Sequence, residues 1–174
     1  LWRNEGVAVT EITPPLNDVH VIRVGCNPGL DSGRTLDSVS IVIESIVENL
    51  ATKQALLGEI QTVFGNQTTL CSNTSTFQID EIASSGIEWP TRLCGMHFFM
   101  PVHARHAVEI VRGRESAADV VSVAIEHAKR LSKHPIECND GPGFIVNRTL
   151  APYLNLSLLL LCRGASADQI ERAA

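Results

Sequence analysis

The sequence has little positive charge and no long apolar run. Its 174 residues include 14 lysines and arginines against 19 aspartates and glutamates, which gives a formal net charge of −5. A broad nucleic-acid-binding surface is unexpected, because binding a polyanion requires clustered basic side chains. The most apolar stretch, residues 154–162, is too short to span a bilayer and indicates a buried helix. We expect neither a nucleic-acid partner nor a transmembrane segment.

Paired cysteine motifs are missing as well. The five cysteines stand at irregular spacings without a C-x-x-C pair, which argues against a disulfide framework and against a zinc ribbon. The chain does not open on a charged segment followed by an apolar run and a cleavage site, so we expect no secretory signal. Both observations fit a reducing compartment, and we expect a cytoplasmic protein.

What the sequence does contain is the pattern of an α/β fold. With 44% apolar residues it can bury a core sufficient for one domain or slightly more. Strands alternate with helices, which predicts a parallel sheet with right-handed crossovers. The β-branched run at residues 41–47 is typical of a central strand. The other expected elements are strands at residues 7–12, 19–24, 68–71 and 92–98, a helix between Asn49 and Gly65, and a short helix at residues 79–83.

The last third of the chain changes character. An apolar run at residues 107–111 and a short strand at residues 136–138 flank a helix that Ser116 and Asp119 would start and that reaches about residue 133. The sequence NDGPG at residues 139–143 then breaks the pattern, and residues 144–161 have helical length. Ser166 with Gln169 can cap one more helix, too short to be stable alone. We expect a sheet domain over residues 1–138, the start of an all-α domain over residues 139–174, and a chain that is part of a longer protein.

Two polar clusters follow expected strands, at the edge where ligands gather in open parallel sheets. Residues 72–76 form one cluster, although a polar turn that caps the next helix would have the same composition. His97 begins the other, in apolar company where a lone histidine is more often a hydrogen-bonded core residue. Glu109 lies in the next apolar run and also needs a partner if it is buried. Two residues that each need a partner favour a His97–Glu109 dyad.

Four segments, taken in order, resemble 3-hydroxyacyl-CoA dehydrogenases. They are CSNTST at residues 71–76, GMHFFMPV at 95–102, EIVRG at 109–113 and DGPGFIVNR at 140–148. The resemblance covers about residues 40–174 and is closest to the dehydrogenase part of the multifunctional fatty-acid oxidation protein. It implies a Rossmann-like sheet, NAD as cofactor, and oxidation of (S)-3-hydroxyacyl-CoA to 3-oxoacyl-CoA in fatty-acid β-oxidation. It also implies a homodimer or a larger β-oxidation assembly.

The same resemblance assigns roles to single residues. His97 would be the general base that takes the proton of the 3-hydroxyl while hydride leaves carbon 3 for NAD, and Glu109 would orient its imidazole. Ser75 and Asn147 would hydrogen-bond the substrate. A histidine, with an ordinary pKa of about 6.5, is suitably poised as a base near neutral pH. The residues implied at the cofactor are Glu48, Lys53, Asn73, Ser75 and Met100.

Two features depart from the family pattern. The sequence contains no G-x-G-x-x-G turn, which would place the pyrophosphate at a helix N-terminus. Met100 stands where the family usually has asparagine, and a thioether cannot replace the amide donor. Glu48 and Lys53 also fit a plainer interpretation as solvated residues at a helix start. We therefore interpret the chain as a partial enzyme with a catalytic half-site and an incomplete cofactor site.

Two other functions stay open at this point. A non-catalytic family member could use the apolar helix at residues 144–161 for binding or oligomerisation. His97, His103, His106 and Glu109 are of the types that bind metals, but their spacing fits neither H-E-x-x-H nor a closed zinc pattern. We therefore expect no metal site.

Overall fold

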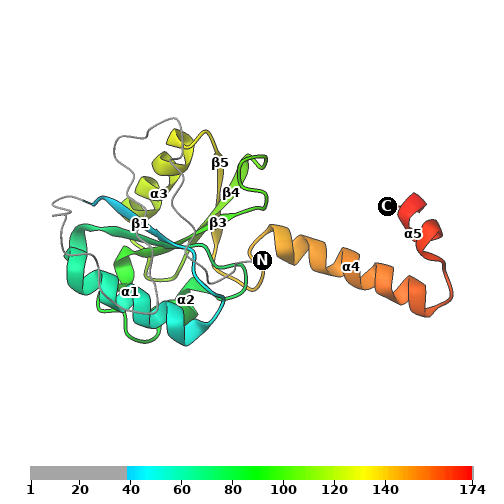
Figure 1. Ribbon diagram of the computed structural model, residues 1–174, viewed down its shortest axis with the longest axis horizontal. Coiled ribbons are helices and arrows are strands. Elements are labelled where there is room, and N and C mark those ends of the chain that lie inside the picture. Colours follow the sequence, from blue (N-terminus) through cyan, green and yellow to red (C-terminus); the bar gives the residue numbers. More distant parts are fainter. Residues whose placement is uncertain (1–38, 174) are drawn as a thin grey trace, which may run out of the picture. The chain divides into compact units, whose positions relative to one another are not determined.

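The computed structural model describes residues 39–173, which belong to a compact unit that runs from residue 38 to residue 174. The strands expected at residues 7–12 and 19–24 lie outside the described residues. Within residues 39–173 the chain forms five strands, five α-helices and two short 3-10 helices (Figure 1). The expected α/β class is confirmed.

One sheet contains all five strands, in the order β1-β2-β3-β4-β5. The first three are parallel, as the alternation of strands and helices predicted. β4 then runs antiparallel to β3, a reversal that the sequence pattern did not predict, and β5 is parallel to β4. The result is a mostly parallel, Rossmann-like sheet. Its strands are β1 (Ile41–Glu44), β2 (Thr69–Ser72), β3 (Leu93–Phe98), β4 (Ala107–Arg112) and β5 (His134–Asn139).

Local signals fix most helix boundaries. Asn49 caps α1, because its side chain accepts a hydrogen bond from the amide of Thr52 at 3.0 Å. Gly65 ends this helix with φ 68°, a left-handed conformation that glycine adopts without steric cost. The helices are α1 (Leu50–Phe64), η1 (Gly65–Gln67), α2 (Ile79–Ala83), η2 (Pro90–Arg92), α3 (Ala118–Arg130), α4 (Val146–Cys162) and α5 (Ala167–Ala173).

The start of α3 differs from the expectation. The Ser116 hydroxyl donates to the carbonyl of Leu93 at 2.5 Å and accepts from the amide of Gly113 at 2.9 Å. Ala117 is the N-cap residue instead, without a side-chain hydrogen bond, and the helix ends at Arg130. The predicted capping box is therefore wrong, because Ser116 is occupied in fastening the preceding turn to β3.

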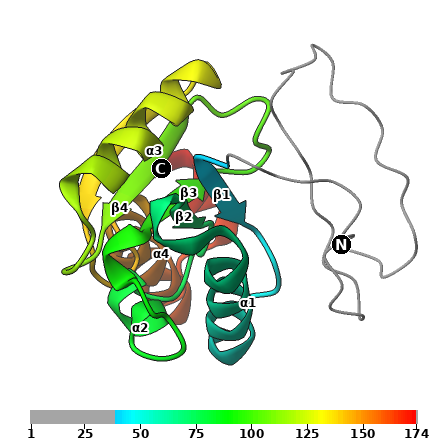
Figure 2. The same cartoon turned by 90° about the vertical axis from the view of Figure 1, so that its left-hand side faces the viewer.

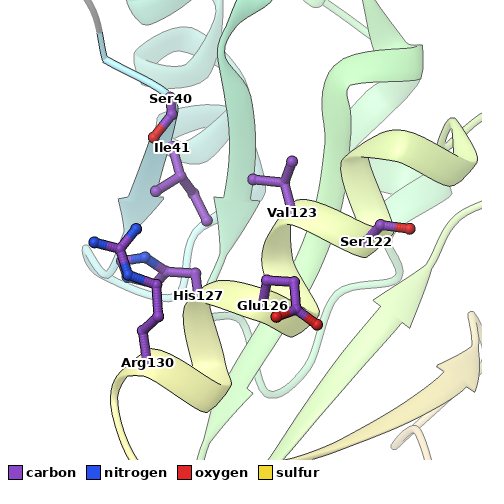
Figure 3. A pocket seen from close by; sticks show the side chains of 7 residues that line it. All are labelled: Ser40, Ile41, Ser122, Val123, Glu126, His127 and Arg130. Carbon is purple, nitrogen blue, oxygen red and sulfur yellow. The ribbon is translucent and has the colours of Figure 1, made fainter.

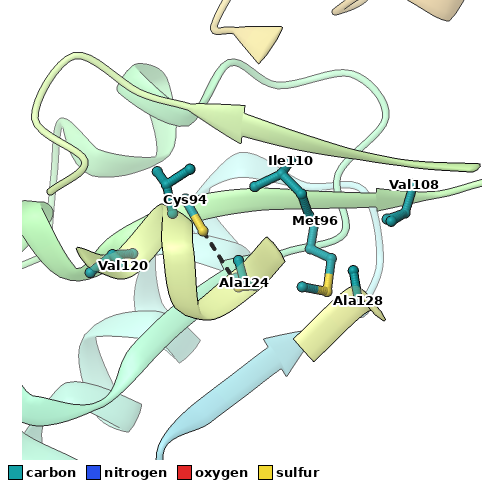
Figure 4. Packing of buried hydrophobic residues seen from close by; sticks show 9 residues of the cluster. Cys94, Met96, Val108, Ile110, Val120, Ala124 and Ala128 are labelled. Atoms are coloured by element: carbon teal, nitrogen blue, oxygen red, sulfur yellow. Dashed lines mark hydrogen bonds between the residues drawn. The ribbon is translucent and has the colours of Figure 1, made fainter. Parts of the chain in front are cut away.

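Helices cover both faces of the sheet. α1 and α2 lie against one face and α3 against the other (Figure 2). On the α3 side, Met96 and Ile110 of the sheet belong to the same buried cluster as Val120 (Figure 4). On the opposite side, Leu57 of α1 and Ile79 of α2 are almost completely buried. Truncating a leucine buried in this way typically lowers the free energy of unfolding by about 2–5 kcal/mol. The helix layers on the two faces therefore contribute much of the stability of the sheet.

The segment after β5 is helical and poorly covered. A buried helix was expected here, but α4 has no buried residue, and its Leu154 and Leu158 are 51% and 59% exposed. Ser166 and Gln169 cap α5 reciprocally, as expected. Among residues 39–173, no helix combines the length and apolar character that a membrane crossing requires. The domain boundary expected after residue 138 stays a prediction.

Candidate active site

Polar side chains gather where the three parallel strands end. The strand register pairs Glu44 with Ser72 and Ser72 with Gly95, so the carboxyl ends of β1, β2 and β3 meet at one edge. His97 follows two residues after Gly95 on β3. Ligands of open α/β sheets bind at this edge.

The expected pair of His97 and Glu109 is present. The antiparallel register of β3 and β4 places the two residues directly opposite each other, which brings their side chains together on one face. Nδ1 of His97 lies 2.7 Å from Oε2 of Glu109, with side chains 7% and 0% exposed. The reversal of β4 therefore creates the pair.

Glu109 has a second set of partners that the sequence did not reveal. Its Oε1 atom accepts hydrogen bonds from the amides of Ile145 and Val146, each at 2.9 Å, where α4 begins. Negative charge is favourable at a helix N-terminus, whose first amides have no partner within the helix. This buried carboxylate thus satisfies its hydrogen-bonding capacity by joining the histidine to the start of α4.

The imidazole of His97 is held by aromatic side chains as well. Its ring centroid lies 4.8 Å from that of Phe99 and 5.6 Å from that of Phe144. An ionised Glu109 can only accept hydrogen bonds, so the pattern assigns the proton of a neutral imidazole to Nδ1. Nε2 then carries the free lone pair, as a general base requires.

Asn73 ties the ends of the parallel strands together. Its amide nitrogen donates to Oγ of Ser45 at 2.9 Å, and its amide oxygen accepts from the backbone of Phe98 at 2.9 Å. These bonds connect the segments that follow β1 and β2 with the last residue of β3. Asn73 therefore fixes the spacing of the edge on which the other candidate residues lie.

Ser75 and Asn147 lie side by side although 72 positions separate them in the sequence. The side-chain amide of Asn147 donates to the carbonyl of Ser75 at 3.3 Å, and the Ser75 residue is exposed. The Asn147 residue is half-buried in the first turn of α4, next to the two residues that bind Glu109. The structure thus brings together the two residues expected to hydrogen-bond the substrate.

Glu48 organises the loop after β2. Its Oε1 atom accepts hydrogen bonds from the hydroxyl of Thr74 at 2.5 Å and from the amides of Ser75 and Thr76 at 3.1 and 3.0 Å. Burial alone would raise the pKa of this carboxyl, but the hydrogen bonds from Thr74 and Lys53 and the Lys53 charge outweigh it, so its pKa lies below its ordinary value. Glu48 is charged at neutral pH while its side chain keeps 32% exposure.

Lys53 and Glu44 form an ion pair that is completely buried. The Lys53 ammonium lies 2.8 Å from Oε1 of Glu44 and 3.2 Å from Oε2 of Glu48. The Ser72 hydroxyl donates to the other oxygen of Glu44 at 2.6 Å. Sequence reasoning missed Glu44, although a carboxylate within the apolar run at residues 41–47 is the kind of interruption that signals a buried polar group.

Two sequence expectations lie apart from this arrangement. Met100 follows β3 and is 78% exposed, and no hydrogen bond of residues 39–173 joins it to the other candidates. In the part of the chain that the structure describes, no group of three or more histidines, cysteines or acidic residues is placed to hold a metal ion. The metal hypothesis therefore gains no support from the geometry.

A pocket of about 260 Å³ lies elsewhere, between the start of β1 and α3 (Figure 3). Its lining includes Ile41 and the α3 residues Glu126, His127 and Arg130. Burial, aided by the nearby Arg130 charge, lowers the pKa of His127. None of the candidate residues borders this pocket, so it is separate from the site at the strand ends.

Comparison with known proteins identifies the fold's relatives. The family described as 3-hydroxyacyl-CoA dehydrogenase, NAD binding domain, matches residues 19–141. The chain belongs to the 3-hydroxyacyl-CoA dehydrogenase family. Its match starts earlier than the sequence reasoning had placed it, since residues 19–39 had been left unmatched. The family is one of oxidoreductases, and this domain is its NAD-binding domain.

Solved structures agree with membership in this dehydrogenase family. The chain is similar to 3-hydroxybutyryl-CoA dehydrogenase from Escherichia coli K12, with 38% identity and a TM-score of 0.70 over 74% of this chain and 27% of that one. It is similar to (S)-3-hydroxybutyryl-CoA dehydrogenase PaaH1 from Ralstonia eutropha, with 35% identity and a TM-score of 0.72 over 75% and 46%. Mycobacterium tuberculosis FadB2 gives 33% identity and a TM-score of 0.70 over 74% and 46%. The chain thus spans about a quarter to a half of these dehydrogenases.

Proposed function

We propose that this chain carries the catalytic half-site of an NAD-dependent enzyme that oxidises (S)-3-hydroxyacyl-CoA to 3-oxoacyl-CoA. One observation carries the proposal: His97 is fixed by Glu109 through Nδ1, at 2.7 Å, on the edge that also presents Ser75 and Asn147. This arrangement leaves Nε2 as the proton acceptor. An oriented base beside hydrogen-bonding groups for an alcohol is what this oxidation requires.

In this proposal His97 accepts the proton of the 3-hydroxyl at Nε2. The imidazolium that forms is stabilised by the negative charge of Glu109. Because the Glu109 side chain is 0% exposed, water does not screen this charge. Phe99 and Phe144 pack around the ring and limit its rotation. The base therefore reaches the hydroxyl without having to reorient.

Ser75 and Asn147 position the substrate in this proposal. A hydroxyl and an amide can donate to the oxygens at carbon 3 and at the thioester carbonyl. Both residues are anchored by backbone contacts, Ser75 through its amide to Glu48 and Asn147 through its place in the first turn of α4. The two side chains come from different segments, so substrate would bind between the loop after β2 and the first turn of α4.

The cofactor side is assigned to Glu48, Asn73, Ser75 and Met100, with Lys53 contributing as the buried partner of Glu48. The structure fits this assignment in part, because Glu48 presents a partly exposed carboxylate at the carboxyl edge and the Ser75 residue is exposed beside it. Such groups suit the hydroxyls of a ribose. NAD, when bound, supplies the acceptor for the hydride that leaves carbon 3. The pyrophosphate has no G-x-G-x-x-G turn to bind in this sequence.

The biological setting is part of the proposal. Two of the similar structures are named as 3-hydroxybutyryl-CoA dehydrogenases, whereas a further one at 27% identity is a dehydrogenase of a pyridine carboxylic acid. We propose an acyl-CoA substrate of fatty-acid β-oxidation on the strength of the former. A cytoplasmic homodimer, or a larger β-oxidation assembly, completes the proposal.

The test is to fuse the chain to an intact dinucleotide-binding half and to measure NADH formation from (S)-3-hydroxybutyryl-CoA. His97→Ala should lower kcat by about 10²- to 10⁴-fold, the usual contribution of a positioned base. His127→Ala is the matched control, because His127 lies on α3 in the separate pocket. A parental kcat in the His97→Ala fusion would contradict the proposal.

A second candidate function is non-catalytic. α4 exposes Leu154, Leu158 and Leu161 by 51%, 59% and 45%, at helical spacing on one side. A helix face of this kind usually contacts another protein surface. If the fusion binds NAD and acyl-CoA but oxidises nothing, this binding or oligomerisation role becomes the better account.

A further inference from the structure

Lys53 is placed where a lysine is not expected. It lies in the first turn of α1, with its amide bonded to the Asn49 carbonyl, and a cation there opposes the helix dipole. Its ammonium is 0% exposed, so it has no surface with which to touch a bound cofactor. Its location is explained by two carboxylates, Glu44 and Glu48, at 2.8 and 3.2 Å.

The three charged groups do not cancel. Two carboxylates around one ammonium leave one excess negative charge. Hydrogen-bond donors around both carboxylates stabilise this charge. Glu44 accepts hydrogen bonds from the Ser72 hydroxyl, at the end of β2, and from the Ile46 amide, just after β1. Glu48 accepts hydrogen bonds from the amides of Ser75 and Thr76 on the loop after β2. The loop amides therefore complete a network that begins inside the sheet.

We propose that Glu44 and Lys53 form a buried positioning pair that holds Glu48 in place, and through Glu48 fixes the loop that presents Ser75. Lys53 then serves the cofactor and substrate site indirectly, and Glu44, which neither the family resemblance nor the fold assigned, becomes part of its support. This inference rests on the proposed function only for the role of Ser75.

The pair acts through electrostatics. Without the Lys53 ammonium, Glu48 loses the cation that holds it against the strand ends, whether or not Glu44 is charged. Its side chain, already 32% exposed, would then move towards water. The amides of Ser75 and Thr76 would then lose their common acceptor. The order of the loop thus depends on the Lys53 charge, which acts on the loop through Glu48.

Hydrogen exchange of the full 174-residue chain, followed by mass spectrometry, tests this without any enzymatic assay. Lys53→Met should speed exchange of the Ser75 and Thr76 amides by about tenfold, because their charged acceptor is released. Lys129→Met is the matched control, since Lys129 forms an exposed pair with Glu126 on α3. The control should leave the loop unchanged.

A second variant guards against simple unfolding. Lys53→Met leaves Glu44 buried without its partner, whereas Glu44→Gln combined with Lys53→Met removes both charges and preserves the packing. The double variant should keep slow exchange in β3 and β4 and still show the faster loop. Slow loop exchange in a folded double variant would overturn the proposal.

Combining two substitutions tests whether Lys53 acts on the loop through Glu48. Glu48→Ala alone should release the loop as far as Lys53→Met does, and the two substitutions together should add nothing further. Additive effects would show that Lys53 acts on the loop by another path and would overturn the proposal. The exchange result is independent of catalysis, so a failed His97→Ala test would reject the proposed function while leaving this inference standing.

Discussion

Oε2 of Glu109 lies 2.7 Å from Nδ1 of His97, across the antiparallel pair of β3 and β4. The other oxygen of the same carboxylate accepts from the amides of Ile145 and Val146. One buried side chain therefore orients the candidate base and anchors α4. Changes at Glu109 should affect chemistry and stability together.

Glu109→Gln should lower the free energy of unfolding by about 1–3 kcal/mol. An amide presents one acceptor and one donor, whereas both sides of Glu109 face donors, so one buried partner would lose its bond. Urea unfolding of the chain measures the loss. Glu137→Gln is the control, because Glu137 is 44% exposed in its pair with Arg112 and should change stability by less than about 0.5 kcal/mol. Equal stabilities of the parent and Glu109→Gln would refute the anchoring role.

The 174-residue chain should bind NADH weakly, with a dissociation constant above the micromolar range. The sequence has no G-x-G-x-x-G turn, and Met100 offers no amide. Met100→Asn should recover about 1 kcal/mol, or about fivefold in affinity, if a neutral hydrogen bond to the nicotinamide is restored. Calorimetric titration measures both values. Micromolar binding by the parent would contradict the first expectation, and unchanged affinity the second.

Glu48 should stabilise the fold in a pH-dependent way. Its pKa is lowered in the folded chain, because the bonds from Thr74 and Lys53 outweigh the effect of burial. The folded state therefore binds the proton less readily than the unfolded state, and the stabilisation is present above pH 4.5 and is lost as pH falls through the lower folded pKa. The difference in unfolding free energy between the parent and Glu48→Gln should accordingly be largest at neutral pH and shrink in acid.

Urea titrations at pH 7 and at steps below pH 4.5 measure that difference. Glu126→Gln, at an exposed position on α3, provides the control and should differ little from the parent at any pH. A difference for Glu48→Gln that grows towards acid pH would reverse the sign expected here.

The isolated chain should self-associate through α4. Leu154 and Leu158 are more than half exposed, and water contact with such a face is unfavourable. Replacing both with lysine should give a monomer in sedimentation velocity. Val63→Lys is the control, because Val63 is 53% exposed on α1 and should leave the association intact. A parent that stays monomeric over a wide concentration range would argue against the interface.

Much of the fold could be predicted because its signals are local. Asn49 and Gly65 enclose α1 with a cap at each end, and Ser166 with Gln169 caps α5 as expected. The reversal of β4 could not be predicted, since strand direction depends on pairing between residues distant in sequence. The cap predicted at Ser116 was wrong for the same reason, because the partner of its hydroxyl is Leu93, a residue of β3 that is distant in sequence.

The candidate site divides in the same way. The pairing of His97 with Glu109 was expected because two polar residues in apolar runs each require a partner. The bonds from Ile145 and Val146 to Glu109 were not, because a carboxylate that caps a helix 36 residues away leaves no local pattern. Glu44 was overlooked because its partner Lys53 lies on a helix whose sequence gives no sign of burial.

The reversal of β4 also bears on the order in which the chain acquires structure. His97 and Glu109 are 12 positions apart, whereas Ser75 and Asn147 are 72 apart. Closing the longer loop costs about 1.6 kcal/mol more in chain entropy, from the logarithmic dependence on loop length. We therefore expect the base and its carboxylate to meet as an early hairpin, and the substrate-binding residues to join only after most of the sheet has formed.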